Sequence, residues 1–578
     1  MSRTAPSAMR HPDEVRRAEK ARRPLPAGRR LGDAALLRGD WGAARDAFAS
    51  ALEIEESPEA LEGLGLAAWW LDLADEVFAS RERAYRLFVE RDDRPGAARV
   101  AVWMAWDCCA FRGETAVANG WLQRARRLLE GLPACSERAW LEVRAGAFAL
   151  LEEGEPDRAC DHSARGISVA QRIGSKDLEM VGRAVQGMAM VATGAVAAGM
   201  RDLDEVNAAM LAGEMTDRVA IGLAGCYMVA ACDRVRDYER ALQWCARMKL
   251  LSAKWGLRAL FAKCRAQYAS LCLWRGMWSE AEEELVAATE ELAACRPAMA
   301  AEGMARLAEL RRRQGRLDEA ERLFAGAEPH GLARLGQAAL AFDRGDLDAA
   351  TEQAERYLRR VAAANRTDRA AGLDLLVRAR ARAGDVDGAR AALAELDAIA
   401  AFAGTVSMRA AARLAAGRVA LAAGEVPAAQ RCCEDAIDLF QACGAPFELA
   451  GAHLELANAQ AARGRGTAAI QEARRAIELL QQLRADLEVS RAEALIESLS
   501  RPRQEPVAAQ RDPAPGLTRR EIEVLRLIAA DLNSRLIATR LSLSEHTVHR
   551  HIANIFHKLG VSSRAAAVAQ AARRHLLG

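Results

Sequence analysis

The chain has 578 residues, more than a single hydrophobic core usually accommodates, which favours several domains or an array of repeats. Its net charge is +2, but residues 516–578 hold ten Lys/Arg against four Asp/Glu, so a polyanion is the expected partner of this end. The thirteen cysteines form no C-x-x-C pair and no run of eighteen residues is uninterruptedly apolar, which argues against a disulfide framework and a membrane span.

The first thirty residues form a basic segment interrupted by four prolines. They lack the apolar core of a secretory signal, so we predict a mobile N-terminal tail and a soluble chain that stays in the cytoplasm. Residues 31–499 have an almost wholly helical hydrophobic pattern, which predicts an all-α fold. Residues 500–515 contain four prolines and predict a semi-extended linker before a last domain at residues 516–578.

One six-residue phrase recurs along residues 31–499. It consists of a glycine, a polar residue, a variable residue, two mostly polar residues and an alanine. From Arg236 onward the copies begin 40, 39, 30, 39, 40 and 40 residues apart, by subtraction of their first positions, and such periods are typical of repeat proteins. The copies begin at Gly39, Gly154, Arg236, Gly276, Gly315, Gly345, Gly384, Gly424 and Gly464.

Each copy predicts the turn of a helical hairpin. The glycine can end one helix in a left-handed conformation, the acidic residue suits the start of the next helix, and the alanine lets two helices approach closely. Such hairpins stack into a superhelix with a concave surface, and eleven to thirteen of them would account for the length. Near the N-terminus Gly113 fits the phrase, whereas Gly194 and the segment around Asp72 fit it only loosely.

The phrase resembles the turn between the two helices of tetratricopeptide repeats, as in Gly315-Arg-Leu-Asp-Glu-Ala-Glu-Arg-Leu-Phe324. This resemblance implies a tetratricopeptide-like α-solenoid that senses or binds something, and the longer period resembles the sensor regions of large bacterial transcription activators. The tryptophans between residues 69 and 140 could line a ligand cavity, although we favour packing between hairpins. Adjacent Cys108 and Cys109 could sense redox state, although we favour a role as small core residues.

Residues 516–578 carry signals for a small helical domain. In its first helix, Thr518 as N-cap and Glu521 three residues later form a capping box. The second helix begins at Asn533 or Ser534, either of which can cap it, and runs to Leu541. The predicted inner face of the first helix comprises Ile522, Leu525, Ile528 and Ala529.

The third helix of this domain follows the N-cap Ser544 and ends at the C-cap Gly560. Its opposite faces differ in chemistry, because Arg550, Ala553 and His557 point away from an apolar stripe. The stripe can seat the helix against two others, and the outer face suits a groove of double-stranded DNA. The apolar residues, spaced by four, three and four, are Val548, Ile552, Ile555 and Leu559.

An ordered set of segments resembles the LuxR-type helix-turn-helix domain of bacterial regulators. They are Leu517-Thr-Arg-Arg-Glu-Ile-Glu-Val-Leu525, Ile537-Ala538, Ser544-Glu-His-Thr-Val-His-Arg-His-Ile552, Lys558-Leu-Gly-Val561 and Arg564. The resemblance implies that DNA backbone contacts come from Thr547, His551 and Lys558. It implies that base edges are faced by His549, Arg550 and Ala553. Residues 563–577 are implied to form a last helix that carries the dimer contact on paired half-sites.

The chain also departs from this family's usual pattern. Asp531 stands where the family usually has glycine, Leu536 where it commonly has glutamate, and Asn533-Ser534 reverses the usual Ser-Asn order. We expect the turn to survive, because the reversed pair can still cap the second helix. His549 is often lysine in relatives, so the target sequence cannot be copied from them.

Three functions of different classes fit these features. The first is a DNA-binding transcription regulator that acts as a homodimer on DNA with RNA polymerase, and whose solenoid senses an unknown protein or small-molecule effector. The second is an ATP-driven regulator, but the chain has no G-x-x-x-x-G-K-[ST] motif, and Ile173-Gly-Ser-Lys176 lacks the loop. The third is a tetratricopeptide-type docking scaffold with little DNA-binding role. We favour the first function, without enzyme activity or membrane contact.

We expect neither a cofactor nor a metal. Five histidines lie between His546 and His575, but no cysteine accompanies them. Because three of them, His549, His551 and His557, are spread around the helix, they do not converge as zinc ligands do.

Overall fold

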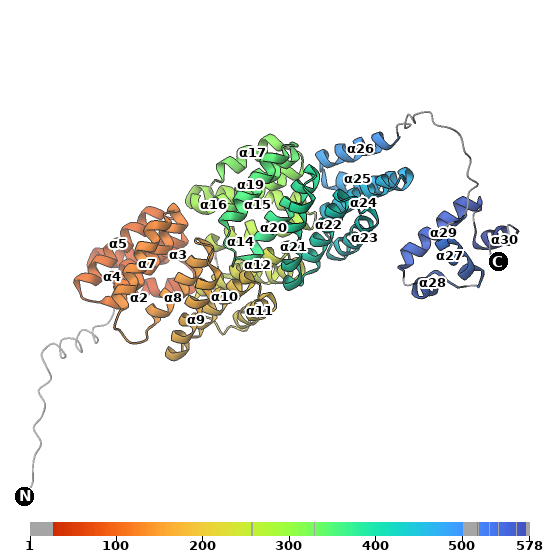
Figure 1. Ribbon diagram of the computed structural model, residues 1–578. Helices are drawn as coiled ribbons and strands as arrows, with labels where there is room; N and C mark the ends of the chain where they lie inside the picture. Colours follow the sequence, from red (N-terminus) through yellow and green to blue (C-terminus); the bar gives the residue numbers. More distant parts are fainter. Residues whose placement is uncertain are drawn as a thin grey trace, which may run out of the picture. The chain divides into compact units, whose positions relative to one another are not determined.

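The computed structural model describes residues 27–500 except 256–257 and 329, and residues 517–573 except 518, 531, 542 and 562. All regular structure in these residues is helical (Figure 1). The chain divides into two compact units, residues 1–501 and 502–578. We call residues 27–500 the repeat unit and residues 517–573 the C-terminal domain. Apart from Ser500, the predicted linker at 500–515 lies outside the described residues, as does most of the predicted tail at 1–30, although the first helix already begins at Ala27.

The repeat unit is a tetratricopeptide-like solenoid, and its described residues form twelve helical hairpins and a last helix, within the range predicted. The first six hairpins are α2 (Ala27–Arg38) with α3 (Trp41–Ile54), α4 (Pro58–Trp70) with α5 (Ala74–Glu90), α6 (Arg94–Asp107) and the π-helix η1 (Cys108–Arg112) with α7 (Thr115–Leu129), α8 (Ser136–Leu151) with α9 (Pro156–Ile173), α10 (Lys176–Thr193) with α11 (Val196–Leu211), and α12 (Arg218–Val235) with α13 (Tyr238–Trp255).

The next six hairpins continue the same alternation along the chain (Figure 1). They are α14 (Arg258–Trp274) with α15 (Trp278–Cys295), α16 (Pro297–Arg313) with α17 (Leu317–Gly326), α18 (Gly331–Asp343) with α19 (Leu347–Arg360), α20 (Arg366–Ala383) with α21 (Val386–Ala403), α22 (Val406–Ala422) with α23 (Val426–Cys443), and α24 (Pro446–Ala462) with α25 (Gly466–Leu483), followed by α26 (Asp486–Ser500). None of the described helices is both long and apolar enough to cross a lipid bilayer.

The turn inside every hairpin has a residue in the left-handed region, which confirms the predicted role of the repeated phrase. Ten of these residues are glycines, and the other two are Asp72 (φ 60°) and Arg236 (φ 55°). The loosely fitting segments at Asp72 and Gly194 are therefore turns of the same kind. The closing alanine of the phrase is fully buried at Ala44, Ala159, Ala241, Ala281, Ala320, Ala350, Ala389, Ala429 and Ala469.

The acidic residue of the phrase caps the second helix of a hairpin in several copies. The side chains of Asp40, Asp346 and Asp385 each accept a hydrogen bond from the backbone N–H three residues later, at 3.0–3.1 Å. Such a cap satisfies one of the backbone donors that have no partner within a helix. The phrase thus ends one helix and begins the next with two adjacent residues.

Hairpins far apart in the sequence also touch, so successive turns of the superhelix pack against each other. Thr405 Oγ1 donates a hydrogen bond to the carbonyl of Val235, 170 residues earlier, at 2.7 Å. Arg313 and Glu448 form an ion pair of 2.9 Å across 135 residues. The repeat period predicts contacts between neighbouring hairpins only, because it contains no information on the pitch of the superhelix.

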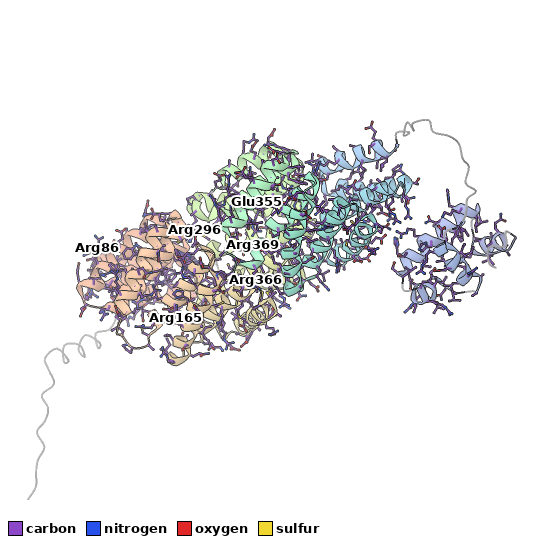
Figure 2. The ribbon with its side chains drawn as sticks, in the orientation of Figure 1. Arg86, Arg165, Arg296, Glu355, Arg366 and Arg369 are labelled. Carbon is purple, nitrogen blue, oxygen red and sulfur yellow. The ribbon has the colours of Figure 1, made fainter. Side chains whose placement is uncertain are left out.

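Arg296 forms the most deeply buried of these cross-turn connections that we identify. Its side chain, 1% exposed, donates to Asp72 Oδ1 and to the carbonyl of Trp69, both at 2.7 Å. The guanidinium also lies over the rings of Trp69 and Phe111, with centroids at 4.1 and 4.3 Å. Arg296, at the start of α16, thereby connects this helix to the second and third hairpins (Figure 2).

The N-terminal tryptophans pack mainly against one another. Trp41 stacks on Trp70 with ring centroids 4.8 Å apart, and Trp103 stacks on Trp106 at 5.3 Å. Trp69, which is 1% exposed, contacts three of these four rings. Packing between hairpins is therefore their principal role, although Trp106 also borders a cavity.

The described cysteines are all unbonded, and none of them is exposed. Burial raises the pKa of Cys108 to about 11 and that of Cys109 to about 12. Because a thiol reacts as the thiolate, these shifts disfavour redox sensing and favour a role as core residues.

Candidate nucleic-acid interface

The C-terminal domain consists of four short helices. They are α27 (Arg519–Ala529), α28 (Ser534–Leu541), α29 (Glu545–Leu559) and α30 (Arg564–Arg573). α28 and α29 pack together across a three-residue turn, which is the geometry of a helix-turn-helix. α27 and α30 both pack against α29 and against each other.

The apolar stripe of α29 packs into the core of the domain. Val548, Ile552, Ile555 and Leu559 are all buried, as their spacing predicts. They meet Val524 and Leu525 of α27, Ile537 of α28 and Ala567 and Ala571 of α30 in one core. The core fixes which face of α29 turns outward.

Both ends of α29 are closed by local hydrogen bonds. Ser544 Oγ accepts from the backbone N–H of Thr547 at 3.0 Å and lies 2.8 Å from Thr547 Oγ1. Gly560 adopts φ 69°, where its N–H bonds to the carbonyl of His557. A residue other than glycine would be strained at this position.

The predicted base-facing residues lie on the outward side of α29. His549 and Ala553 are exposed, and Arg550 is half-buried. Of the predicted backbone-contacting residues, Thr547 and His551 are half-buried beside them. Five of the six predicted DNA contacts therefore lie on the helix surface outside the buried stripe, within its first three turns.

Lys558, the sixth predicted contact, is engaged inside the domain. Its Nζ lies 2.6 Å from Glu521 Oε2, and the two side chains are 32% and 5% exposed. The pair connects the end of α29 to the start of α27. Sequence reasoning assigned Glu521 to a capping box and did not foresee this partner; Thr518, the other half of the box, lies outside the described residues.

Two further contacts hold α28 in place. Asn533 Oδ1 accepts from the backbone N–H of Leu536 at 3.0 Å, so the first residue of the reversed Asn-Ser pair caps the helix. Ser534 Oγ accepts from Arg564 Nη2 at 2.5 Å, which ties α28 to α30. The turn thus keeps its cap despite its departure from the usual residue order.

The predicted inner face of α27 is partly wrong. Leu525 and Ile528 are buried, but Ala529 is exposed and Ile522 only half-buried, whereas Val524 is fully buried. The inner face is rotated, because it is centred on the position of Glu521, whose carboxylate is buried through its pairing with Lys558. Because Glu521 is charged, a hydrophobicity pattern does not count it as a buried position and therefore places the inner face of α27 incorrectly.

The C-terminal domain matches a known family. Residues 515–571 match the model of bacterial regulatory proteins, luxR family. The chain is 48% identical over 64 residues to the probable transcriptional regulatory protein NarL of Mycobacterium tuberculosis (strain ATCC 25618 / H37Rv), covering 11% of this chain and 30% of that protein. It is 46% identical over 59 residues to the spore germination protein GerE of Bacillus subtilis (strain 168), covering 10% of this chain and 80% of that protein.

A solved structure is similar to this chain over most of its length. It is the crystal structure of the APC/C hetero-tetramer Cut9-Hcn1, with 14% sequence identity and a TM-score of 0.45 over 84% of this chain and 98% of that chain. The family assignment rests on the C-terminal domain alone. By that domain, the chain belongs to the luxR family of bacterial regulatory proteins.

Proposed function

We propose that this protein regulates transcription by inserting α29 into the major groove of double-stranded DNA. The observation that carries the proposal is the division of α29 into a buried stripe and an outward side that bears His549, Arg550 and Ala553. A helix seated in this way presents its side chains to base edges, as recognition helices of helix-turn-helix proteins do. The basic charge of residues 516–578 supplies attraction to phosphates at every sequence.

Within this proposal the six side chains have separate duties. His549 and Arg550 read base edges, with the small Ala553 leaving room beside them, and a guanine is the natural partner of Arg550. Thr547 and His551 contact the DNA backbone and fix the register of the helix. Lys558 contributes positive charge, but its pairing with Glu521 makes it a positioning residue of the domain as well.

The protein binds DNA as a homodimer in the cytoplasm and acts there on RNA polymerase. A two-fold dimer places two recognition helices on half-sites about one helical turn apart. α30 is the candidate dimer contact, since its outer side exposes Ala565, Ala569 and Ala572. The small side chains would let two copies of the helix approach closely.

The repeat unit senses a protein or small-molecule effector and controls when the C-terminal domain reaches DNA. The partly open cavity of its superhelix supports this role, because a sensor needs a site whose occupation can favour one state of the protein. If the isolated C-terminal domain and the full chain bound DNA with equal affinity with and without cell extract, this coupling would be wrong.

Binding-site selection from random duplexes, followed by sequencing, tests the DNA-binding proposal. The full chain and the isolated C-terminal domain should enrich the same motif, and the full chain should shift a duplex from the region upstream of its own gene. Recovery of unselected sequences after several rounds would refute sequence-specific binding. It would favour instead a protein-docking scaffold with little DNA-binding role.

A further inference from the structure

The superhelix of the repeat unit lines a partly open cavity of about 1780 Å³. Helices from the third hairpin to α26 contribute to its wall, so it runs through most of the unit. Its volume exceeds the roughly 300–1,000 Å³ of usual small-molecule sites. Twelve arginines and ten acidic residues line it, an unusually charged interior for a ligand cavity.

Six of the twelve arginines in the wall pair with acids from other helices. Arg306 on α16 pairs with Asp233 on α12 at 2.8 Å. Arg418 on α22 pairs with Glu455 on α24 at 2.9 Å. These pairs satisfy the requirement that a charge removed from bulk water be paired. They therefore belong to the scaffold of the cavity.

Arg378 on α20 lacks such a partner. Its guanidinium lies 4.6 Å from the ring centroid of Phe342, and that of Arg382, one helical turn later, lies 5.4 Å from the same ring. Neither guanidinium forms a hydrogen bond or an ion pair within 4 Å to any carboxylate in the part of the chain that the structure describes. Two cations thus lie against the same aromatic ring at the cavity wall.

The acids nearest to Arg378 are already engaged. Asp343 bonds to Arg312 and to Arg491, the latter at 3.3 Å, and is 2% exposed. Asp374 lies 3.6 Å from Arg418. Burial, followed by the nearby positive charge of Arg418, lowers the pKa of Arg378. A half-buried guanidinium in this position is stabilised by any anion that enters the cavity.

A second arginine of the same cavity has a similar environment. Arg144 on α8 lies 3.9 Å over the ring of Trp106 and forms no ion pair with the described carboxylates. Burial lowers its pKa as well. The stacking of both residues on aromatic rings holds each guanidinium plane in place and leaves its N–H donors for another partner.

We propose that the cavity binds an oxyanion ligand, a carboxylate or phosphate group, which Arg378 and Arg382 hold beside the Phe342 ring. Paired guanidiniums match the planar oxygens of carboxylates and the faces of phosphates, with two parallel hydrogen bonds. This inference rests on the proposed function and names the chemistry of the signal that the repeat unit senses. Arg144 provides a further cationic contact for a ligand long enough to reach it.

Titration of the purified full chain with three probes tests the site: inorganic pyrophosphate, citrate and a hexaglutamate peptide, each at constant ionic strength in a calorimeter. At least one probe should bind saturably, at one site per chain. Arg378→Met should weaken that binding at least about tenfold, because a charge-assisted hydrogen-bonding partner is lost. Tighter binding of pyrophosphate would assign a phosphoryl ligand, and tighter binding of citrate or hexaglutamate a carboxylate ligand.

Arg366→Met is the matched control. Arg366 lies on the same helix, also over an aromatic ring, that of Phe402 at 5.8 Å, but it is exposed and outside the cavity wall (Figure 2). This variant should bind the probe as the unchanged chain does. Arg382→Met, which alters an exposed side chain, should weaken binding like Arg378→Met and guards against a folding defect of the latter.

Removal of an unpaired cation should leave the melting temperature of Arg378→Met equal to or above that of the unchanged chain. Absence of saturable binding by all three probes would overturn the proposal. Equal affinity of the Arg378, Arg382 and Arg366 variants would overturn it too. Since the titration contains no DNA, such a failure counts against the cavity site alone, whereas failure to select a DNA motif counts against the proposed function.

Discussion

Arginine side chains differ in burial and ion pairing between the two units of this chain. In the repeat unit, Arg312 and Arg313 are each less than a tenth exposed and both pair with Glu309 at 2.8 Å. In the C-terminal domain, Arg540 is exposed on α28, and Arg535, whose side chain is 86% exposed, makes only a 4.0 Å surface ion pair with Glu545. Paired arginines give the long solenoid a fixed interior, whereas exposed ones leave charge available for a polyanion. An arginine that follows neither pattern, such as Arg378, is for that reason a candidate for ligand binding.

The largest expected effect is on the interior of the repeat unit. Arg296→Met should lower the free energy of unfolding of this unit by about 3 kcal/mol, because it removes buried hydrogen bonds to Asp72 and Trp69. Arg165→Met is the control, since this arginine is 54% exposed and its pair with Glu142 should contribute under about 1 kcal/mol (Figure 2). Urea denaturation measures the free energy of unfolding of both variants. Equal losses would show that the cross-turn contact of Arg296 stabilises the unit no more than a surface ion pair does.

The ion pairs of Glu309 in the interior of the repeat unit predict that this unit loses stability in acid. Burial opposes ionisation of Glu309, but Arg312 and Arg313 outweigh it and lower the pKa of this carboxyl to about 2 from the ordinary 4.5. A depressed folded-state pKa gives stability that is present above about pH 4.5 and is lost as the pH falls towards 2. The contribution is up to about 3 kcal/mol.

Glu309→Gln should therefore flatten the decline of the melting temperature below pH 4.5. Glu352→Gln, which removes only an exposed partner of Arg356, should leave that decline unchanged. Identical pH profiles for the two variants would mean that the Glu309 pair does not contribute.

In the C-terminal domain, Lys558→Ala should lower stability by about 2 kcal/mol, because the nearly buried Glu521 loses its ion pair with Lys558. The double change Glu521→Gln with Lys558→Met should recover most of this loss. If Lys558 also contacts a phosphate, the single variant should bind all DNA sequences more weakly and reduce the salt slope by about one unit. A melting temperature equal to that of the unchanged domain would contradict the structural role.

A smaller effect is expected at the start of α29. Ser544→Ala removes the cap of Thr547 and should lower the stability of the domain by about 1 kcal/mol. Ser544→Asp keeps an acceptor at the same place and should be close to the original in thermal denaturation. Equal melting temperatures of the alanine and aspartate variants would show that the cap does not matter.

Local features of the fold could be predicted from the sequence because they depend on neighbouring residues. The positions of the hairpin turns follow from glycine, an acidic residue and alanine at fixed offsets. The buried face of α29 follows from the spacing of Val548, Ile552, Ile555 and Leu559. The segment around Asp72 fits the phrase only loosely, because a residue other than glycine in a left-handed turn leaves a weak signal.

Long-range features could not be predicted in this way. The Arg296–Asp72 contact joins residues 224 positions apart, and no local pattern encodes the pitch that brings them together. The partner of Lys558 and the missing partner of Arg378 are also invisible in one sequence, where 81 Lys/Arg face 79 Asp/Glu. Only the packed structure shows which charges are paired.

The central claim is that the outward side of α29 reads a DNA sequence. Fluorescence anisotropy with the full chain, the selected duplex and a scrambled duplex at a fixed salt concentration tests it most directly. The selected duplex should bind at least about 1,000-fold more tightly, and Arg550→Ala should lose about 1–3 kcal/mol of discrimination at one base pair. Equal affinity of the unchanged chain for the two duplexes would contradict the claim.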